Sequence, residues 1–468
     1  MRFVGRVSEL GRLRAALDQR RASLIRVSGI RGGGKTALVE RVMPDYDHMV
    51  HRAAPLPDYV QRATFARLTA KARAARGLES RLEEGAPPWT ELLPEVVDLA
   101  PRDSRPFVLV LDDVHRLREA RSRYLQPLLS LLDTARERQR ALHVVLIGPE
   151  HAMPTDDEAT PHLAETLRVA PLPFRSACSL LPGSRPVDLV RAYSVFGGIP
   201  RVLASLDRDV TVGTNIRRLL ISPDAVLSDI GGEWLERDVQ SPARYYAILS
   251  ALAHGDADWS TMHAAVPGLS RSGQVAPYIK RLEELGLLTA RRSLDAGPMT
   301  RARRYAIADP VFAFWLRFIL PARSQVTHQR PEDLYSTVIR PALDRHIAHV
   351  FPLICRQHMA HDAIETLGSN AREGGSLWGD GYDLPVAGIL TSGAAYYGAC
   401  YSELAGPATE VPLESLDEQM RETRYGFGRE RRVRLVFTRQ NPPQWLQRQV
   451  ARRHDAELID ARALAGIG

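Results

Sequence analysis

A glycine-rich run that ends in lysine and threonine is the part of this sequence with the most specific chemistry. It reads Gly29-Ile30-Arg31-Gly32-Gly33-Gly34-Lys35-Thr36, with Ala37 next, and fits G-x-x-x-x-G-K-[ST] in full. The glycines let successive backbone N–H groups point at phosphate oxygens, and a helix starting at the lysine adds its positive end. In this pattern the lysine reaches the β- and γ-phosphates and the threonine hydroxyl binds Mg²⁺. The sequence therefore predicts that residues 29–37 bind ATP with Mg²⁺, and that Lys35 also serves catalysis.

A second candidate group is a pair of carboxylates at the end of an apolar run. Phe107-Val-Leu-Val-Leu is followed by Asp112 and Asp113. In a phosphate-transfer site, the first acid holds Mg²⁺ and the second orients the attacking water. We therefore assign Asp112 to the metal and Asp113 to catalysis. Because Asp113 is an aspartate, with a shorter reach than glutamate, ATP binding is the firmer prediction and hydrolysis is expected to be slow.

These residues need a parallel sheet to position them. Short apolar runs at 24–28, 107–111 and 142–147 alternate with longer helical patterns, which is typical of an α/β P-loop NTPase domain with a parallel sheet between helices. We place that domain at residues 1–205, followed by a helical connector at 206–240. A helical, winged-helix domain follows at 241–322, and a C-terminal α/β domain at 323–468.

The composition limits the class of protein. Of 468 residues, 44% are hydrophobic, so the chain can bury proper cores. No apolar run is long enough for a membrane span, and the charged N-terminus is unlike a secretory signal. Cys178, Cys355 and Cys400 fit neither a zinc motif nor a disulfide framework, which favours the cytoplasm. The net charge is +7, with only three lysines against 59 arginines, so the lysine at position 35 is itself notable.

Two further motifs carry a family resemblance. Phe3-Val-Gly-Arg6-Val-Ser-Glu-Leu precedes the glycine-rich loop, and Gly197-Gly198-Ile-Pro200-Arg follows the predicted sheet. With the loop and the Asp pair, this order resembles the archaeal-type ATPase family, which is related to AAA+ and STAND ATPases, over residues 1–322. The resemblance implies that Arg6, Gly198 and Pro200 touch the nucleotide. A helix end followed by a turn is the alternative reading of the Gly-Gly-Ile-Pro run.

The chain departs from that family at one position. After the strand at 142–147, the family places a small polar residue that senses the γ-phosphate. Here the sequence is Gly148-Pro149-Glu150-His151, so Glu150 and His151 are the remaining candidates. No arginine finger is assigned.

Residues 241–322 carry the pattern of a winged helix. Apolar helical patterns at 243–254, 259–265 and 272–285 lead into a hairpin at 287–307. Its basic side chains could bind duplex DNA without sequence specificity, because no cluster of Asn or Gln is present to read bases. Packing of the hairpin against the chain's own domains or a partner is the alternative. The candidate DNA contacts are Arg271, Lys280, Arg281, Arg291, Arg292, Arg301, Arg303 and Arg304.

The C-terminal domain resembles a PD-(D/E)xK nuclease that has lost its chemistry. In that family a helix Glu, a strand Asp and an E-x-K motif hold a divalent metal and assist water. Here Pro352 stands at the helix position, Asp383 is retained, and Ala399 and Tyr401 replace the E-x-K residues. The resemblance therefore implies an inactive nuclease-like domain. A domain of another kind is the alternative.

The sequence thus favours a cytoplasmic STAND/AAA+-type ATP-driven switch that binds ATP or ADP and engages DNA or a protein partner. Self-association is an open alternative, and no membrane is expected as a partner. The competing functions are a DNA-binding regulator with a vestigial ATPase and, less favoured, an ATP-dependent nuclease.

Overall fold

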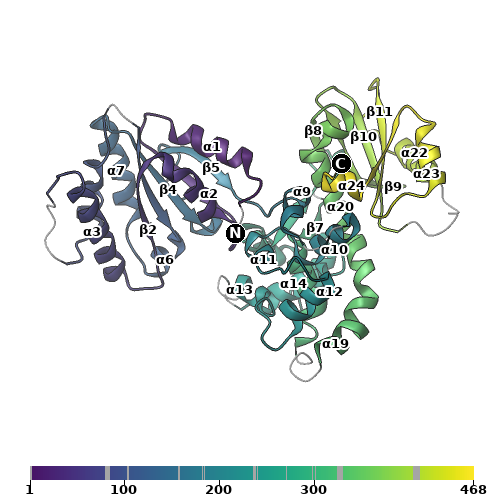
Figure 1. Ribbon diagram of the computed structural model, residues 1–468, viewed down its shortest axis with the longest axis horizontal. Coiled ribbons are helices and arrows are strands. Elements are labelled where there is room, and N and C mark those ends of the chain that lie inside the picture. Colours follow the sequence, from purple (N-terminus) through teal and green to yellow (C-terminus); the bar gives the residue numbers. More distant parts are fainter. Residues whose placement is uncertain are drawn as a thin grey trace. The chain divides into compact units, whose positions relative to one another are not determined.

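The computed structural model describes residues 3–79, 85–102, 105–155, 159–181, 183, 185–235, 239, 241–269, 271–297, 299–300, 302–323, 330–403 and 412–467. The chain divides into two compact units, Met1–Ala170 and Pro171–Gly468 (Figure 1). The end of the nucleotide domain predicted from the sequence is residue 205. The difference arises because residues 171–205 pack on helices much later in the chain. Within the described part of the chain, no helix combines the length and the apolar character that a membrane span needs.

The first unit is a parallel sheet with helices on both faces. The strand order is β2-β3-β4-β1-β5, and every neighbouring pair is parallel. The strands are β1 (Ser23–Ser28), β2 (Asp47–Arg52), β3 (Phe107–Asp112), β4 (Leu142–Gly148) and β5 (Leu163–Arg168). The helices are α1 (Val7–Leu17), α2 (Lys35–Val42), α3 (Asp58–Ala74), α4 (Trp89–Leu92), α5 (Pro94–Val97), α6 (Val114–Glu119) and α7 (Leu125–Glu137). The α/β fold predicted for this part of the chain is confirmed.

Two apolar clusters explain why the sheet is covered on both sides. All residues of β1, β3 and β4 are buried. Side chains alternate between faces along a strand, so Leu109 joins the cluster under α3, α4, α5 and α7, whereas Val108 and Val110 join the cluster under α1 and α2. Strands buried on both faces are apolar at most positions, as these three are, and their buried polar residues include Arg26, Asp112 and His143.

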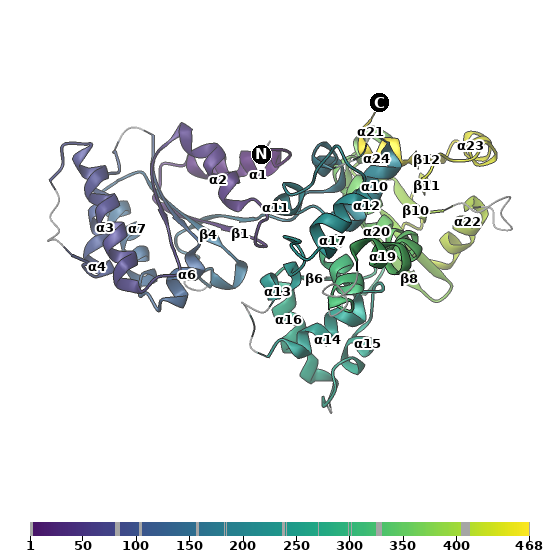
Figure 2. The same ribbon diagram turned by 60° about the horizontal axis from the view of Figure 1, so that its bottom comes forward.

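The second unit begins with short helices. They are α9 (Phe174–Ala177), α10 (Pro186–Phe196), α11 (Pro200–Leu203), α12 (Val212–Ile216) and α13 (Ile230–Leu235). Next come α14 (Ala243–Leu252), α15 (Trp259–Ala264), α16 (Ala276–Glu284), β6 (Leu288–Arg291) and β7 (Arg304–Ile307), with β6 and β7 antiparallel. Figure 2 shows α14, α15 and α16 grouped below β6. Three helices and a hairpin are therefore present in the predicted order, and their designation as a winged helix stays a prediction.

A second sheet completes this unit. The remaining helices of the unit are α17 (Pro310–Phe314), α19 (Pro331–Leu334), α20 (Arg340–His361), α21 (Ala363–Leu367), α22 (Pro412–Glu422), α23 (Gln444–Ala451) and α24 (Ala461–Ala465). The strands are β8 (Ala371–Gly379), β9 (Tyr382–Leu390), β10 (Ala395–Tyr401), β11 (Arg432–Thr438) and β12 (Ala456–Asp460), in the order β12-β11-β10-β9-β8. Strands β8, β9 and β10 pair antiparallel, and β10, β11 and β12 pair parallel. The C-terminal α/β domain predicted from the sequence is therefore present.

Candidate nucleotide site

The glycine-rich loop connects the buried end of β1 to the first turn of α2. Gly29 has φ +147°, and a Cβ there would lie 2.4 Å from the carbonyl oxygen of Val169. Gly34 has φ +91° and directly precedes α2. Residues that carry a Cβ rarely adopt these backbone angles, so glycine is required at both positions. The loop therefore takes a course that places Lys35 and Thr36 at the start of a helix, as predicted.

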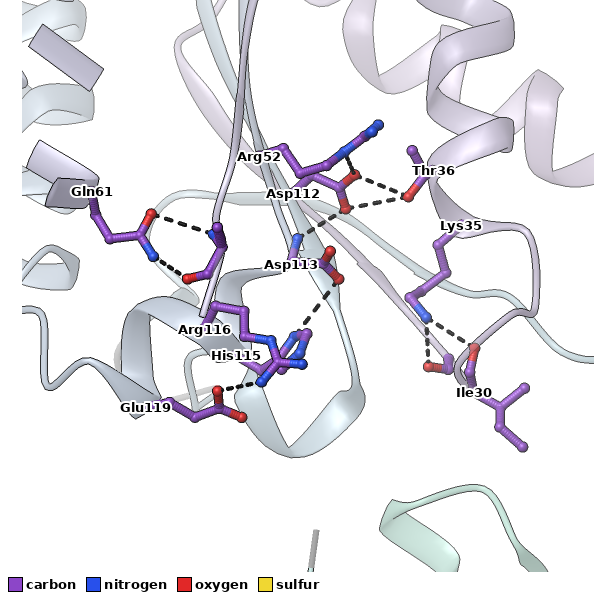
Figure 3. Close-up of polar contacts among 12 residues, drawn as sticks. Ile30, Lys35, Thr36, Arg52, Gln61, Asp112, Asp113, His115, Arg116 and Glu119 are labelled. Carbon is purple, nitrogen blue, oxygen red and sulfur yellow. Dashed lines mark hydrogen bonds and ion pairs between the residues drawn. The ribbon is translucent and has the colours of Figure 1, made fainter. Parts of the chain in front are cut away.

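Lys35 lies folded back inside the loop. Its Nζ donates hydrogen bonds to the carbonyl oxygens of Gly29 at 3.0 Å and Ile30 at 2.9 Å (Figure 3). Burial lowers the pKa of Lys35 to about 8, and the negative charges of Asp113 and Asp112 oppose that effect. An ammonium group held near anion-binding backbone N–H groups is suited to phosphate oxygens.

Thr36 and Asp112 meet at the carboxyl end of β3. The Thr36 Oγ1 donates to Asp112 Oδ2 at 3.0 Å and to Oδ1 at 3.3 Å. Burial, followed by the neighbouring charge of Asp113, raises the pKa of Asp112. A hydroxyl and a single carboxylate on adjacent elements match how Mg²⁺ is held beside nucleotide phosphates, where water and phosphate oxygens supply the other ligands. The donor set therefore fits Mg²⁺.

Asp113 occupies the turn from β3 into α6. Its backbone is left-handed, with φ +57°, and its N–H donates to Asp112 Oδ1 at 2.9 Å. The side chain is 49% exposed and lies 3.8 Å from Nδ1 of His115. An aspartate adopts this backbone angle at modest cost. The turn therefore keeps Asp112 buried and exposes Asp113 to solvent. A buried position suits the predicted metal ligand Asp112, and an exposed position suits the predicted water-orienting group Asp113.

Arg6 lies at the same loop, although it comes from the N-terminal motif. It precedes α1, and its Nη2 donates to the carbonyl oxygen of Gly33 at 3.2 Å and to that of Ala170. Its Nη1 pairs with Glu9 at 2.9 Å. The structure therefore places Arg6 against the backbone of the phosphate-binding loop.

Sequence reasoning missed Arg52. It ends β2, directly opposite Asp112 in the parallel register, and its Nε lies 3.2 Å from Asp112 Oδ2. Its Nη2 also pairs with Glu40 on α2 at 3.1 Å. The only sequence signal is that Arg52 closes a strand, and the strand order that places it beside Asp112 cannot be read from the sequence.

Glu150 lies just after β4, in the segment where the sequence departs from the archaeal-type ATPase family. The hydroxyl of Ser28, just before the glycine-rich loop, donates to Glu150 Oε2, and Arg168 pairs with Oε1 at 3.0 Å. By contrast, His151 uses its backbone carbonyl to accept from Arg118 at 2.7 Å. Of the two candidate sensors, Glu150 is the one hydrogen-bonded to the strand that leads into the loop.

Gly197 and Gly198 lie in the second unit and have a packing role there. The Gly198 N–H donates to Asp309 Oδ2 at 3.1 Å, and a Cβ on Gly198 would lie 2.0 Å from the carbonyl oxygen of Leu172. A Cβ on Gly197 would lie 1.8 Å from Asp309 Oδ1. Burial raises the pKa of Asp309 to about 6. Close packing against Asp309, at the start of α17, and against Leu172 thus explains why glycine stands at positions 197 and 198. Pro200 is the first residue of α11. Nucleotide contact by Gly198 and Pro200 stays a prediction.

Several of the candidate DNA-binding side chains form ion pairs within the second unit. Arg291 pairs with Asp256, and Arg304 pairs with Asp383 at 2.9 Å and lies over the Trp378 ring. On α16, Lys280 and Arg281 share Glu284 at 3.9 and 3.4 Å. Arg271 and Arg292 are exposed, Arg303 is half-buried, and Arg301 lies outside the described residues.

The hairpin loop also packs on the second sheet. The Leu294 N–H donates to the carbonyl oxygen of Ser376 at 3.1 Å, and Tyr382 donates to Asp295 at 2.5 Å. Leu294 packs against the apolar cluster between this sheet and α22. The hairpin is therefore held by β8, β9 and α22 on one side.

The residues expected at a nuclease centre lie on α20, β9 and β10. Pro352 is inside α20, Asp383 on β9 pairs with Arg304, and Ala399 and Tyr401 are on β10. In the described ranges, no group of three or more His, Cys, Asp or Glu side chains could hold a metal ion.

Comparisons with known proteins give the family of the first unit. Residues 2–147 match the AAA ATPase domain. An uncharacterized protein of Methanocaldococcus jannaschii is 22% identical over 331 residues, which cover 69% of this chain and 70% of that protein.

Solved structures give the fold. A Walker-type ATPase of Pyrococcus abyssi superposes with a TM-score of 0.52 at 22% identity, covering 67% of this chain and 96% of the other. The ORC2 protein of Aeropyrum pernix superposes with a TM-score of 0.39 at 14% identity, covering 68% of this chain and 95% of the other. Residues 2–147 of this chain therefore carry an AAA ATPase domain, and 67% of the chain shares the fold of an archaeal Walker-type ATPase.

Proposed function

We propose that this protein is a Mg²⁺-dependent, slowly hydrolysing ATP switch. The observation that carries the proposal is the convergence of four side chains at one end of the sheet. Lys35 and Thr36 start α2, Asp112 ends β3 and Asp113 follows it in the turn to α6, with Thr36 hydrogen-bonded to Asp112. Each of the four has a separate task in phosphate transfer.

The protein's own groups would divide the work as follows. Lys35 exchanges its bonds to the carbonyls of Gly29 and Ile30 for bonds to phosphate oxygens. Thr36 and Asp112 hold Mg²⁺, which neutralises phosphate charge when bound. Asp113, half exposed beside them, accepts a hydrogen bond from the attacking water. Arg52 balances the buried charge of Asp112.

Slow rather than fast turnover is supported by the length of the second acid. Asp113 has one methylene fewer than a glutamate, so it reaches less far toward a γ-phosphate. Its left-handed backbone also limits how it can move to compensate. Tight binding with slow hydrolysis is the behaviour that suits a switch.

The second unit would bind the partner through which the switch acts. A protein partner is favoured over duplex DNA. The predicted hairpin uses Arg291 and Arg304 for ion pairs within the unit. The exposed side chains of α16 include Glu283 as well as Lys280, so this helix presents mixed charge. A surface that recognises DNA phosphates would be expected to be uniformly basic.

We propose that the domain built on the second sheet takes part in this binding, and that it is nuclease-like but does not cleave nucleic acid. Asp383 is 60% exposed and is paired with Arg304, an arrangement that supplies one carboxylate where a metal site needs several oxygen ligands. Supercoiled plasmid incubated with Mg²⁺ and ATP should remain intact. Cleavage that is lost in Asp383→Asn would overturn this part of the proposal.

The proposal is tested by ATP binding and phosphate release in the full chain. Lys35→Ala should abolish Mg²⁺–ATP binding, and Asp113→Ala should bind ATP but release no phosphate. Lys280→Ala is the matched control, because its side chain is 80% exposed on α16. ATP binding by Lys35→Ala that equals the control would reject the proposed site. Phosphate release by Asp113→Ala at the wild-type rate would reject the role of Asp113.

A further inference from the structure

A protruding aromatic residue marks a surface of the second unit that has no role in the function above. The loop at residues 423–431 joins α22 to β11, both labelled in Figure 1. Phe427 at its tip is 83% exposed, more than any other aromatic side chain in the described part of the chain. An aromatic ring left in water gives up the stabilisation that burial would provide, so its position needs an explanation.

The backbone of the loop is fixed in the form that exposes this ring. Gly426 and Gly428 flank Phe427 with φ +66° and +79°. The hydroxyl of Tyr397 donates to the carbonyl oxygen of Tyr425 at 2.5 Å, and Arg429 Nη1 donates to the carbonyl oxygen of Gly393 at 2.8 Å. These bonds tie both sides of the tip to β10 and to the turn before it. Phe427 is therefore presented by an anchored loop.

The same segment is strongly basic. Residues 421–432 contain five arginines and two glutamates. Arg429 and Arg432 bond to backbone carbonyls. Arg421, Arg424 and Arg431 are exposed, and none of them has an ion pair or hydrogen bond with a described side chain. Glu422 and Glu430 are exposed in the same segment, so three guanidinium groups and two carboxylates flank Phe427 in sequence, and the guanidinium groups remain available to an external anion.

We propose that this surface, defined by Arg421, Arg424, Phe427 and Arg431, binds single-stranded nucleic acid. An aromatic face stacks on an unpaired base of any identity, while arginines contact the flanking phosphates. A duplex keeps its base faces stacked inside the helix, so Phe427 would have nothing to stack on. The net positive charge of the loop complements a polyanion and steers it to the ring. This surface belongs to the second unit and the nucleotide-binding residues belong to the first, and the proposal does not rest on ATPase activity.

Fluorescence anisotropy with the full chain tests this proposal. The probes are labelled oligo(dT) and oligo(U) of about twenty nucleotides and a duplex DNA of the same length. Phe427→Ala should weaken single-strand binding about tenfold, the effect of removing one stacked base, and Phe427→Trp should restore it. The triple variant Arg421→Gln, Arg424→Gln, Arg431→Gln should weaken binding and flatten its dependence on salt, by about 0.7 in log–log slope per lost phosphate contact. The single strand that binds with the higher affinity, oligo(dT) or oligo(U), identifies the natural polymer as DNA or RNA.

The control removes charge elsewhere on the same sheet domain. Arg448 and Arg452, on and just after α23, are exposed, so Arg448→Gln with Arg452→Gln should leave binding unchanged. Because Phe427 makes little packing contact, circular dichroism and the unfolding temperature should not change in Phe427→Ala. Equal affinity of wild type and Phe427→Ala for both single strands would overturn the proposal. So would a preference for duplex, or Phe427-dependent binding to anionic vesicles without binding to single strands.

Discussion

Replacing Lys35 by methionine should stabilise the nucleotide-free protein while it removes ATP binding. Burial lowers the pKa of Lys35 from its usual 10.5 to about 8. Each tenfold change in a proton equilibrium corresponds to about 1.4 kcal/mol, so at pH 7 the charge on Lys35 costs the folded state about 3 kcal/mol relative to the unfolded chain. Methionine has a similar length and carries no charge. It loses the bonds to the carbonyls of Gly29 and Ile30, which offsets part of the gain.

The pH dependence separates these effects, because only the charge titrates. The folded pKa lies below the unfolded one, so between about pH 8 and 10.5 the unfolded chain holds more protons and wild-type stability rises with pH. Methionine lacks this gain. The stability advantage of Lys35→Met over wild type should therefore shrink by about 2 kcal/mol between pH 7 and 9.5.

The assay is denaturant unfolding of the first unit at several pH values without nucleotide or Mg²⁺. Lys280→Met is the control for the exchange of a lysine for methionine, since the Lys280 side chain is 80% exposed on α16. A constant difference between Lys35→Met and wild type from pH 7 to 9.5 would refute the reasoning that the loop holds a buried charge.

Three further outcomes are expected. Asp113→Asn should keep ATP affinity but slow phosphate release about 100-fold in single-turnover assays, because the amide no longer accepts the proton of the attacking water; an unchanged rate would contradict this. Gly198→Ala should lower the free energy of unfolding of the second unit by about 2 kcal/mol or more, because its methyl group would lie 2.0 Å from the Leu172 carbonyl oxygen; an unchanged unfolding temperature would count against the described packing. In a double-mutant cycle, Arg304→Gln and Asp383→Asn should couple by only about 0.5 kcal/mol, because the pair is partly exposed; a coupling above about 2 kcal/mol would mean that the pair is effectively buried.

The interior of the first sheet could be predicted from the sequence, and its edges could not. Strands β1, β3 and β4 are buried on both faces, so they appear as mostly apolar runs, with Arg26 in β1 and His143 in β4 as interior exceptions. Strands β2 and β5 lie at the edges of the sheet. In β2 four residues are exposed, and in β5 four are partly buried and one is exposed, so the sequences Asp-His-Met-Val-His-Arg and Leu-Ala-Glu-Thr-Leu-Arg carry no such signal. The same holds for β8, an edge strand with three glycines and two charged residues.

The site was predictable to the extent that its chemistry is local in the chain. Residues 29–37 and the Asp112–Asp113 pair are contiguous motifs, so spacing alone identifies them. Arg52 and Glu150 reach the site through strand order, and nothing in their neighbouring residues indicates it. The Gly197–Gly198 pair could be recognised as a motif, but its contact with Asp309 joins segments more than a hundred residues apart.

The central claim is that Lys35, Thr36 and Asp112 together form a Mg²⁺–ATP site. Titration calorimetry of the full chain with a slowly hydrolysed ATP analogue, with Mg²⁺ and with EDTA, tests it most directly. We predict binding to wild type that weakens at least tenfold in EDTA, no binding to Lys35→Ala, and binding to Asp112→Asn that no longer responds to Mg²⁺. Equal affinity of all three proteins in both buffers would contradict the account.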